Sequence, residues 1–230
     1  MAQNNALASL CQLLEYTFKD QSLLVQALTH RSAASVNNER LEFLGDGMLN
    51  FVIAARLFEQ YPDMQEGDLS RLRASLVNKD SLADIARSLQ LGEYVKLGSG
   101  ELKSGGRRRA SILADAVESI IGAVFLDSGF DTCRQLVLHL YADKLLNIPD
   151  VSALKDAKTR LQELLQARRY SLPVYNVTDV SGKAHKQMFT VECVIEELDC
   201  VTTATGGSRR KAEQVAAELA IEDVNRKIKS

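Results

Sequence analysis

Tryptophan is absent from this chain of 230 residues, and cysteine, proline and histidine are scarce, with four, three and three residues respectively. The cysteines form no CxxC pair and do not lie near a histidine at zinc-ligand spacing, which argues against a zinc site or a disulfide framework. No apolar run approaches about 18 residues, and the N-terminus lacks the basic and apolar segments of a secretory signal. These absences predict a cytoplasmic protein without a membrane span.

A strong net charge is also missing, since the formal value is −2 and the isoelectric point is about 6.0. The charge is unevenly divided: residues 1–150 carry a net −4 and residues 151–230 a net +2. No global basic field therefore points to a nucleic-acid partner. The clustering of basic residues near the C-terminus matters more than their small excess.

The first 147 residues are predicted to form an all-α domain. Apolar residues recur there at intervals of three and four, as on the buried face of a helix. The segments with this pattern are 7–14, 22–28, 41–59, 69–77, 81–89, 112–126 and 133–145. Asn37 or Asn38 is a plausible N-cap for the third segment. The glycines and charges of 97–109 predict a flexible loop.

The pattern changes after a short expected linker over 148–154. A helix is predicted at 159–168, and the Val, Thr, Phe and Tyr content of 174–180, 188–195 and 201–205 predicts three strands. Ser208 is positioned to cap a last amphipathic helix that runs to about residue 224. The second domain, 155–226, is therefore predicted to be a small α+β module of order α-β-β-β-α.

Acidic residues on two apolar segments are the most informative feature of the sequence. They follow spacings of i, i+3, i+7 in the first segment and i, i+3 in the second, so each set shares one helix face. Few polar neighbours accompany them, and 110–130 contains no Lys or Arg, which predicts carboxylates buried in a core. The set consists of Glu39, Glu42, Asp46, Asp115 and Glu118.

Buried carboxylates without basic partners must bind a proton or a cation. Oxygen ligands alone suit Mg²⁺ or Mn²⁺, which can polarise a phosphoryl oxygen and lower the pKa of bound water. The pattern therefore predicts metal-dependent hydrolysis of a phosphodiester. The alternative is a set of ordinary salt bridges on solvated helices. Gly45 and Gly47 each cost about 1 kcal/mol within a helix, which suggests close approach by another helix or a ligand.

Five sequence blocks resemble the bacterial ribonuclease III family in order and spacing. The most specific is NERLEFLGDGML at 38–49, which is similar to the signature motif of that family. The supporting blocks are ALTHRS at 27–32, EGDLSRLRASLV at 66–77, LGSGELKSGG at 97–106 and ILADAVESIIGAVFLD at 112–127. The C-terminal module resembles a double-stranded RNA-binding domain, so the resemblance covers essentially the whole chain.

The resemblance implies a homodimeric, Mg²⁺-dependent endoribonuclease that cuts double-stranded RNA and leaves 5′-phosphate and 3′-hydroxyl ends. Its targets are expected among rRNA, mRNA and tRNA precursors. Asp46 and Glu118 are expected to be catalytic, Glu39 to engage substrate, and Phe43 to reach into the partner subunit. The implied metal ligands are Glu42, Asp46, Asp115 and Glu118. Glu66 is a weaker candidate for a residue that lines the same site.

Three segments of the C-terminal module resemble the contact regions that read the shape of an RNA duplex. They supply polar groups on the first helix, a loop at 181–187 and a basic helix start, where the helix dipole also favours phosphate. The residues concerned are Thr159, Gln162, Glu163, His185, Arg209, Arg210 and Lys211. Glu213 stands where the usual pattern has a further basic residue, so the phosphate contact is expected to be altered there.

Two other functions are compatible with parts of this pattern. A non-catalytic dimer that binds double-stranded RNA would use the acids only structurally, and a phosphohydrolase for small substrates would leave the C-terminal module without a purpose. Arg107–Arg109 are expected to brush the RNA backbone, and His30 is expected to be structural.

Overall fold

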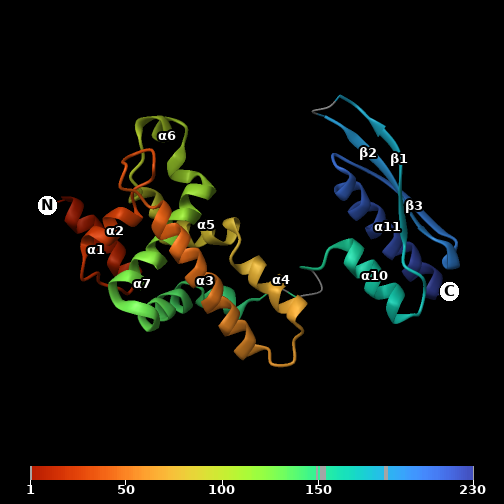
Figure 1. Ribbon diagram of the computed structural model, residues 1–230, viewed down its shortest axis with the longest axis horizontal. Helices are drawn as coiled ribbons and strands as arrows, with labels where there is room; N and C mark the ends of the chain where they lie inside the picture. The colour runs from red at the N-terminus through yellow and green to blue at the C-terminus, as the bar shows by residue number, and fades with distance from the viewer. Residues whose placement is uncertain (1, 149, 151–153, 184–185, 230) are drawn as a thin grey trace. The chain divides into compact units, whose positions relative to one another are not determined.

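The computed structural model describes residues 2–148, 150, 154–183 and 186–229. The chain divides into two compact units, Met1–Pro149 and Asp150–Ser230. The first unit is helical, and the second combines helices α10 and α11 with a three-stranded sheet (Figure 1). This element order confirms the predicted fold class. The linker expected at 148–154 falls mostly on residues outside the described part of the chain.

The helical unit contains all seven segments that were predicted as helices. Its α-helices are α1 (Ala2–Leu13), α2 (Gln21–Ala27), α3 (Glu39–Gln60), α4 (Glu66–Leu76), α5 (Lys79–Ser88), α6 (Ser99–Lys103), α7 (Ala110–Leu140) and α8 (Ala142–Leu146). Two short 3₁₀ helices, η1 (Leu91–Glu93) and η2 (Gly106–Arg108), complete it. The prediction of a flexible loop over 97–109 was wrong, because α6 and η2 lie within that segment.

Helix α7 covers two segments that were predicted as separate helices, and it is interrupted at Gly129. This glycine has φ 78° and ψ −172°, in the left-handed region that side-chain-bearing residues avoid. Beyond it, the Cys133 thiol donates a hydrogen bond of 3.5 Å to the carbonyl oxygen of Ile121. A straight helix would separate these two residues by about 18 Å. The chain therefore turns back at Gly129 and packs on its own first half.

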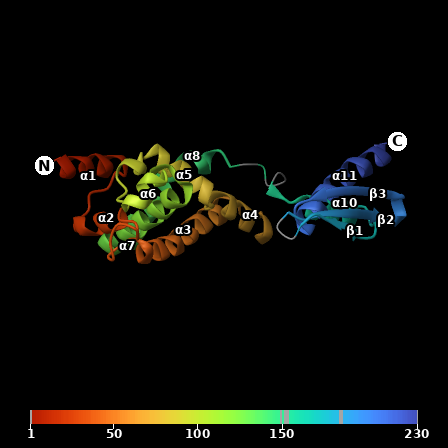
Figure 2. The same ribbon diagram turned by 90° about the horizontal axis from the view of Figure 1, so that it is seen from above.

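Helices α3 and α7 form the centre of this unit and lie side by side (Figures 1 and 2). Their backbones touch at two glycines. A Cβ atom built on Gly45 would lie 1.8 Å from the carbonyl oxygen of Glu118, and one on Gly122 would lie 2.2 Å from that of Leu41. A Cβ on Gly47 would meet no atom within 4 Å. Close approach to another helix within this chain thus explains Gly45 and not Gly47.

Helix α3 is buried on one side only, so the expectation that its acidic residues lie in a core was only partly right. One face packs into the core through Leu49, Ile53 and Leu57, whereas the opposite face exposes large aromatic side chains. Phe43 is 82% exposed and Phe58 is 72% exposed. Hydropathy alone cannot distinguish an apolar residue that faces the core from one that packs against a partner subunit.

Among the described residues, no helix is both long enough and apolar enough to cross a membrane.

The second unit has the predicted order α10 (Ala157–Ala167), β1 (Val174–Ser181), β2 (Met188–Ile195), η3 (Glu196–Leu198), β3 (Cys200–Gly206) and α11 (Arg209–Lys229). The sheet is antiparallel in the order β1-β2-β3, with Cys193 opposite Thr202 and a register shift between Val177 and Asp179. Its inner face shares one hydrophobic core with both helices. The predicted cap of α11 is confirmed, because the Ser208 hydroxyl oxygen accepts a hydrogen bond from Lys211 N.

Candidate metal centre and RNA-binding surface

Three of the five predicted acids converge where α3 crosses α7. Glu42 lies on α3, and Asp115 and Glu118 lie one turn apart on α7. One carboxylate oxygen from each lies within 4.8 Å of the other two. The backbone contact at Gly45 brings α3 against the carbonyl of Glu118, and Glu42 stands one turn earlier on α3. The close helix crossing is therefore the structural cause of the cluster.

The charges of this cluster are not balanced within it. Burial, followed by the charges of Asp46, Glu42 and Asp115, raises the pKa of Glu118 to about 8. Burial is also the main cause of the raised pKa of Glu42, to which Asp115 adds. From the residues that the structure describes, no ion pair or side-chain hydrogen bond reaches the three carboxylates. Close carboxylates in this state cannot all ionise unless a cation joins them.

The two remaining acids lie at the edge of the cluster. Asp46 is exposed, and its carboxylate accepts a hydrogen bond of 2.8 Å from the side-chain amide of Asn50. Glu39 is also exposed and forms an ion pair of 3.3 Å with Arg31. The expectation that all five acids are buried without basic partners was therefore wrong for these two, because they point to the solvent side of α3.

Sequence reasoning missed the cations that face the cluster from other segments. The pKa of Asp115 is raised mainly by burial, but the charges of His30, Arg31 and Lys79 oppose this rise. A hollow of about 320 Å³ beside the cluster is lined by His30, Arg31, Asn38, Glu39, Glu42, Glu101, Arg109, Ser111, Ile112 and Asp115. The ALTHRS block at 27–32 contains His30 and Arg31, but its sequence did not show that these side chains face the acidic cluster.

The donor set fits a hard divalent cation. Carboxylate oxygens are the ligands that Mg²⁺ and Mn²⁺ favour, and three of them lie close enough together to share one ion. Burial raises the pKa values of all three acids, and neighbouring carboxylates add to the rise at Glu42 and Glu118, so a cation here would relieve repulsion. Glu42, Asp115 and Glu118 are therefore the residues that could hold a metal.

Polar and basic residues meet at the adjoining N-terminal ends of α10 and α11. Thr159, Gln162, Arg209 and Arg210 line a shared hollow of about 600 Å³ with Asp156, Lys158, Glu213 and Gln214. Lys211 is exposed on the first turn of α11 but does not line the hollow. Glu163 on α10 accepts hydrogen bonds from Lys155 at 2.8 and 2.9 Å. The expected contact at His185 lies outside the described residues.

Both units match known protein families. Residues 20–145 match the family model described as ribonuclease-III-like, and residues 157–224 match the double-stranded RNA binding motif.

The chain belongs to the ribonuclease III family.

Among its relatives, a ribonuclease 3 from Vibrio vulnificus (strain YJ016) is 57% identical over 96% of this chain and 98% of its own length. A ribonuclease 3 from Bordetella avium is 57% identical over 94% of this chain and 86% of its own. A solved nuclease domain of ribonuclease III from Campylobacter jejuni is 48% identical, with a TM-score of 0.58 over 59% of this chain and 95% of that one. That structure shows structural flexibility in a region involved in dimer formation.

The ribonuclease III match and the acidic cluster fall in the same unit. The matched range 20–145 contains Glu42, Asp115 and Glu118 and the crossing of α3 with α7 that brings them together. The RNA-binding motif ends at residue 224, within α11. This ribonuclease III endoribonuclease therefore carries its acidic cluster and its RNA-binding motif on separate compact units.

Proposed function

We propose that this ribonuclease III endoribonuclease uses Mg²⁺, held by Glu42, Asp115 and Glu118, to hydrolyse phosphodiester bonds of double-stranded RNA. The convergence of the three carboxylates within 4.8 Å, with no ion pair to them from the described residues, is the observation that supports the metal site. Mn²⁺ is expected to substitute because it accepts the same oxygen ligands. The products have 5′-phosphate and 3′-hydroxyl ends, and the substrates are structured regions of rRNA, mRNA and tRNA precursors.

The cation supplies polarisation of a phosphoryl oxygen and a lower pKa for bound water. The chain supplies the charge and the shape of the site. Glu42, Asp115 and Glu118 fix the ion at the crossing of α3 and α7, and Asn50 holds the Asp46 carboxylate at the rim, where we assign it a catalytic role. Glu39 lies farther out and is assigned to substrate engagement, with Arg31 beside it.

The second unit holds the duplex in this proposal. Its hollow at the N-termini of α10 and α11 offers hydroxyl, amide and guanidinium groups to a surface of 2′-hydroxyls and phosphates. The residues assigned to RNA contact are Thr159, Gln162, Glu163, His185, Arg209, Arg210 and Lys211. Recognition by shape agrees with the variety of proposed substrates.

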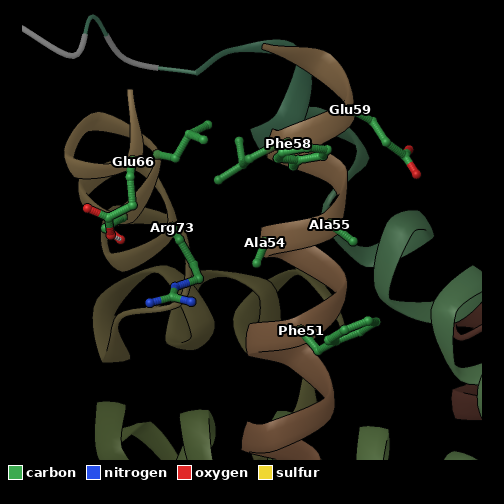
Figure 3. A pocket seen from close by; sticks show the side chains of 10 residues that line it. Phe51, Ala54, Ala55, Phe58, Glu59, Glu66 and Arg73 are labelled. Atoms are coloured by element: carbon green, nitrogen blue, oxygen red, sulfur yellow. Dashed lines mark hydrogen bonds between the residues drawn. The ribbon is translucent and has the colours of Figure 1, made fainter. Parts of the chain in front are cut away.

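The working form is proposed to be a homodimer in which each subunit cuts one strand. The exposed aromatic face of α3 supports this, because Phe43, Phe51 and Phe58 are 82%, 59% and 72% exposed. An apolar groove of about 570 Å³ lies beside this face, and Figure 3 shows Phe58 and Ala54 of α3 facing Glu66 and Arg73 of α4. Glu66 thus lines this groove and is outside the three-acid cluster. Phe43 is assigned to the dimer interface.

A cleavage assay separates this function from that of a non-catalytic RNA-binding dimer. A long RNA duplex is incubated with the protein and Mg²⁺, and then with the protein and EDTA. The proposal expects short duplexes with Mg²⁺ and intact RNA with EDTA, with binding in both cases. A duplex that is bound but uncut at every Mg²⁺ and Mn²⁺ concentration would favour the non-catalytic dimer.

A further inference from the structure

Glu213 is a buried acid in the middle of the basic start of α11. It is 8% exposed, and its two carboxylate oxygens accept hydrogen bonds from Lys158 Nζ at 2.7 Å and Arg209 Nε at 2.8 Å. Lys158 belongs to α10 and Arg209 to α11. The side chain therefore joins the two helices, and both of its carboxylate oxygens are engaged by cations at the edge of the hollow.

The two cations bound to Glu213 are held differently. Lys158 Nζ also lies 4.2 Å from the centre of the Tyr175 ring, so a carboxylate and an aromatic face hold it in place. The Arg209 side chain is 62% exposed, and Glu213 engages only its Nε atom. None of the described residues binds its two terminal amino groups, and Arg209 lines the hollow. Glu213 thus holds Arg209 at Nε and leaves the two terminal amino groups of the guanidinium to contact a phosphate.

Gln214, the next residue along α11, also connects this helix to the first turn of α10. Gln214 Oε1 accepts a hydrogen bond of 3.2 Å from Lys158 N, and Gln214 Nε2 donates one of 3.1 Å to Asp156. Asp156 in turn accepts 3.0 Å from Thr159 N and so caps α10. Glu213 and Gln214 together set the position of Arg209 relative to Thr159.

We propose that Glu213 is a positioning residue for RNA recognition, which orients Arg209 toward a backbone phosphate and fixes its distance from the contact groups of α10. This inference rests on the proposed role of Arg209 in RNA binding. It also gives a reason for an acid at a place where the usual motif has a base. A lysine at 213 would face Lys158 and Arg209, and three like charges would meet in a buried site.

Simple electrostatics makes the opposite prediction. If Glu213 is only a negative charge near RNA, its neutralisation should strengthen binding. If it positions Arg209, Glu213→Gln should weaken binding although the protein becomes more positive. The sign of the change in affinity therefore distinguishes the two explanations.

The test measures the affinity of the full chain for a blunt RNA duplex in EDTA, where no cleavage occurs, over a range of NaCl concentrations. The variants are Glu213→Gln, Arg209→Ala and the double variant. The matched control is Glu222→Gln, an exposed acid on the same helix. We expect Glu213→Gln to weaken binding about threefold to tenfold. Arg209→Ala should reduce the slope of log affinity against log NaCl concentration by the amount expected for about one phosphate contact. The control should bind at least as well as wild type. In the Arg209→Ala background, Glu213→Gln should have no further effect.

Each other outcome overturns a defined part of the proposal. Glu213→Gln binding as tightly as the control, or an additive loss in the double variant, overturns the positioning role. If Arg209→Ala leaves affinity and salt slope unchanged, Arg209 is not an RNA contact, and the proposed function is wrong at this residue. If Glu213→Gln unfolds the unit by circular dichroism, Arg209→Lys decides, because it keeps the charge and the Lys158–Glu213 pair. Arg209→Lys should bind as weakly as Arg209→Ala, and wild-type affinity would overturn the inference.

Discussion

Gly45→Ala is expected to destroy the metal site without removing any of its ligands. The added methyl group would lie 1.8 Å from the carbonyl oxygen of Glu118 and 2.6 Å from its carbonyl carbon. An ordinary contact needs about 3.4 Å or more, so α3 and α7 must separate locally by about 1.6 Å. Metal ligands tolerate errors of only about 0.2 Å. The separation would therefore move Glu42 out of reach of an ion held by Asp115 and Glu118.

The stability change follows from two opposing effects. Overpacking a tight core costs about 1–3 kcal/mol, and this contact is with backbone, which cannot rotate away. Replacing glycine by alanine in a helix contributes about 1 kcal/mol of stability. Because the backbone cannot yield, the upper end of the overpacking cost applies, and the net loss is about 2 kcal/mol. This loss corresponds to a fall in the melting temperature of about 4–8 °C for a chain of this size.

Thermal unfolding with and without Mn²⁺ measures both effects. A cation at one hundred times its dissociation constant stabilises the native state by about 2.7 kcal/mol. Wild type should show this stabilisation, and Gly45→Ala should show none. Gly47→Ala is the matched control, because the same methyl group there meets no atom within 4 Å. It should keep the stabilisation by Mn²⁺. Equal responses to Mn²⁺ in the Gly45 and Gly47 variants would refute the reasoning.

Four further predictions concern three side chains. Glu118→Gln should bind an RNA duplex within about twofold of wild type and lose cleavage, as measured by gel shift and product analysis, because most of the proposed RNA contacts lie in the other unit. Because the pKa of Glu118 is raised to about 8 in the folded, ion-free chain, the native state holds an extra proton between about pH 4.5 and 8. Stability in EDTA should therefore fall as pH rises through that window, and Glu118→Gln should reduce this slope; equal slopes would contradict the assignment. Phe43→Ser should shift the sedimentation equilibrium from dimer to monomer, whereas Leu146→Ser, at the same 82% exposure, should not. Asp127→Ala should destabilise the chain by on the order of 1–3 kcal/mol in urea unfolding, since Asp127 accepts hydrogen bonds from the Tyr16 hydroxyl, Lys19 N and Asp20 N. Asp131→Ala, at an exposed site four residues on, should change stability much less.

The helices and strands could be predicted from sequence because their signals are local. Apolar residues three and four apart mark α3 and the first half of α7, and runs rich in β-branched residues mark β1 to β3. The membership of the acidic cluster could not be predicted this way. Spacing places Glu39 and Asp46 on the same helix face as Glu42, but only Glu42 joins Asp115 and Glu118. That selection depends on where two helices cross, which is a tertiary property.

Two other features were hidden for the same reason. Apart from Phe43, which the family resemblance singled out, the exposed aromatic residues of α3 could not be identified, because hydropathy does not say which apolar face has a partner within the chain. Glu213 stood at a position associated with phosphate contact, yet it turns inward to Lys158, which lies 55 residues earlier in the sequence. Such a partner cannot be read from the local pattern around α11.

The central claim is that Glu42, Asp115 and Glu118 hold one divalent cation at the crossing of α3 and α7. Anomalous diffraction from crystals grown with Mn²⁺ and an RNA duplex tests it most directly. If these residues hold the ion, a manganese peak should lie about 2.0–2.2 Å from a carboxylate oxygen of each of them. A peak elsewhere, or these carboxylates paired with lysine or arginine and no peak between them, would contradict it.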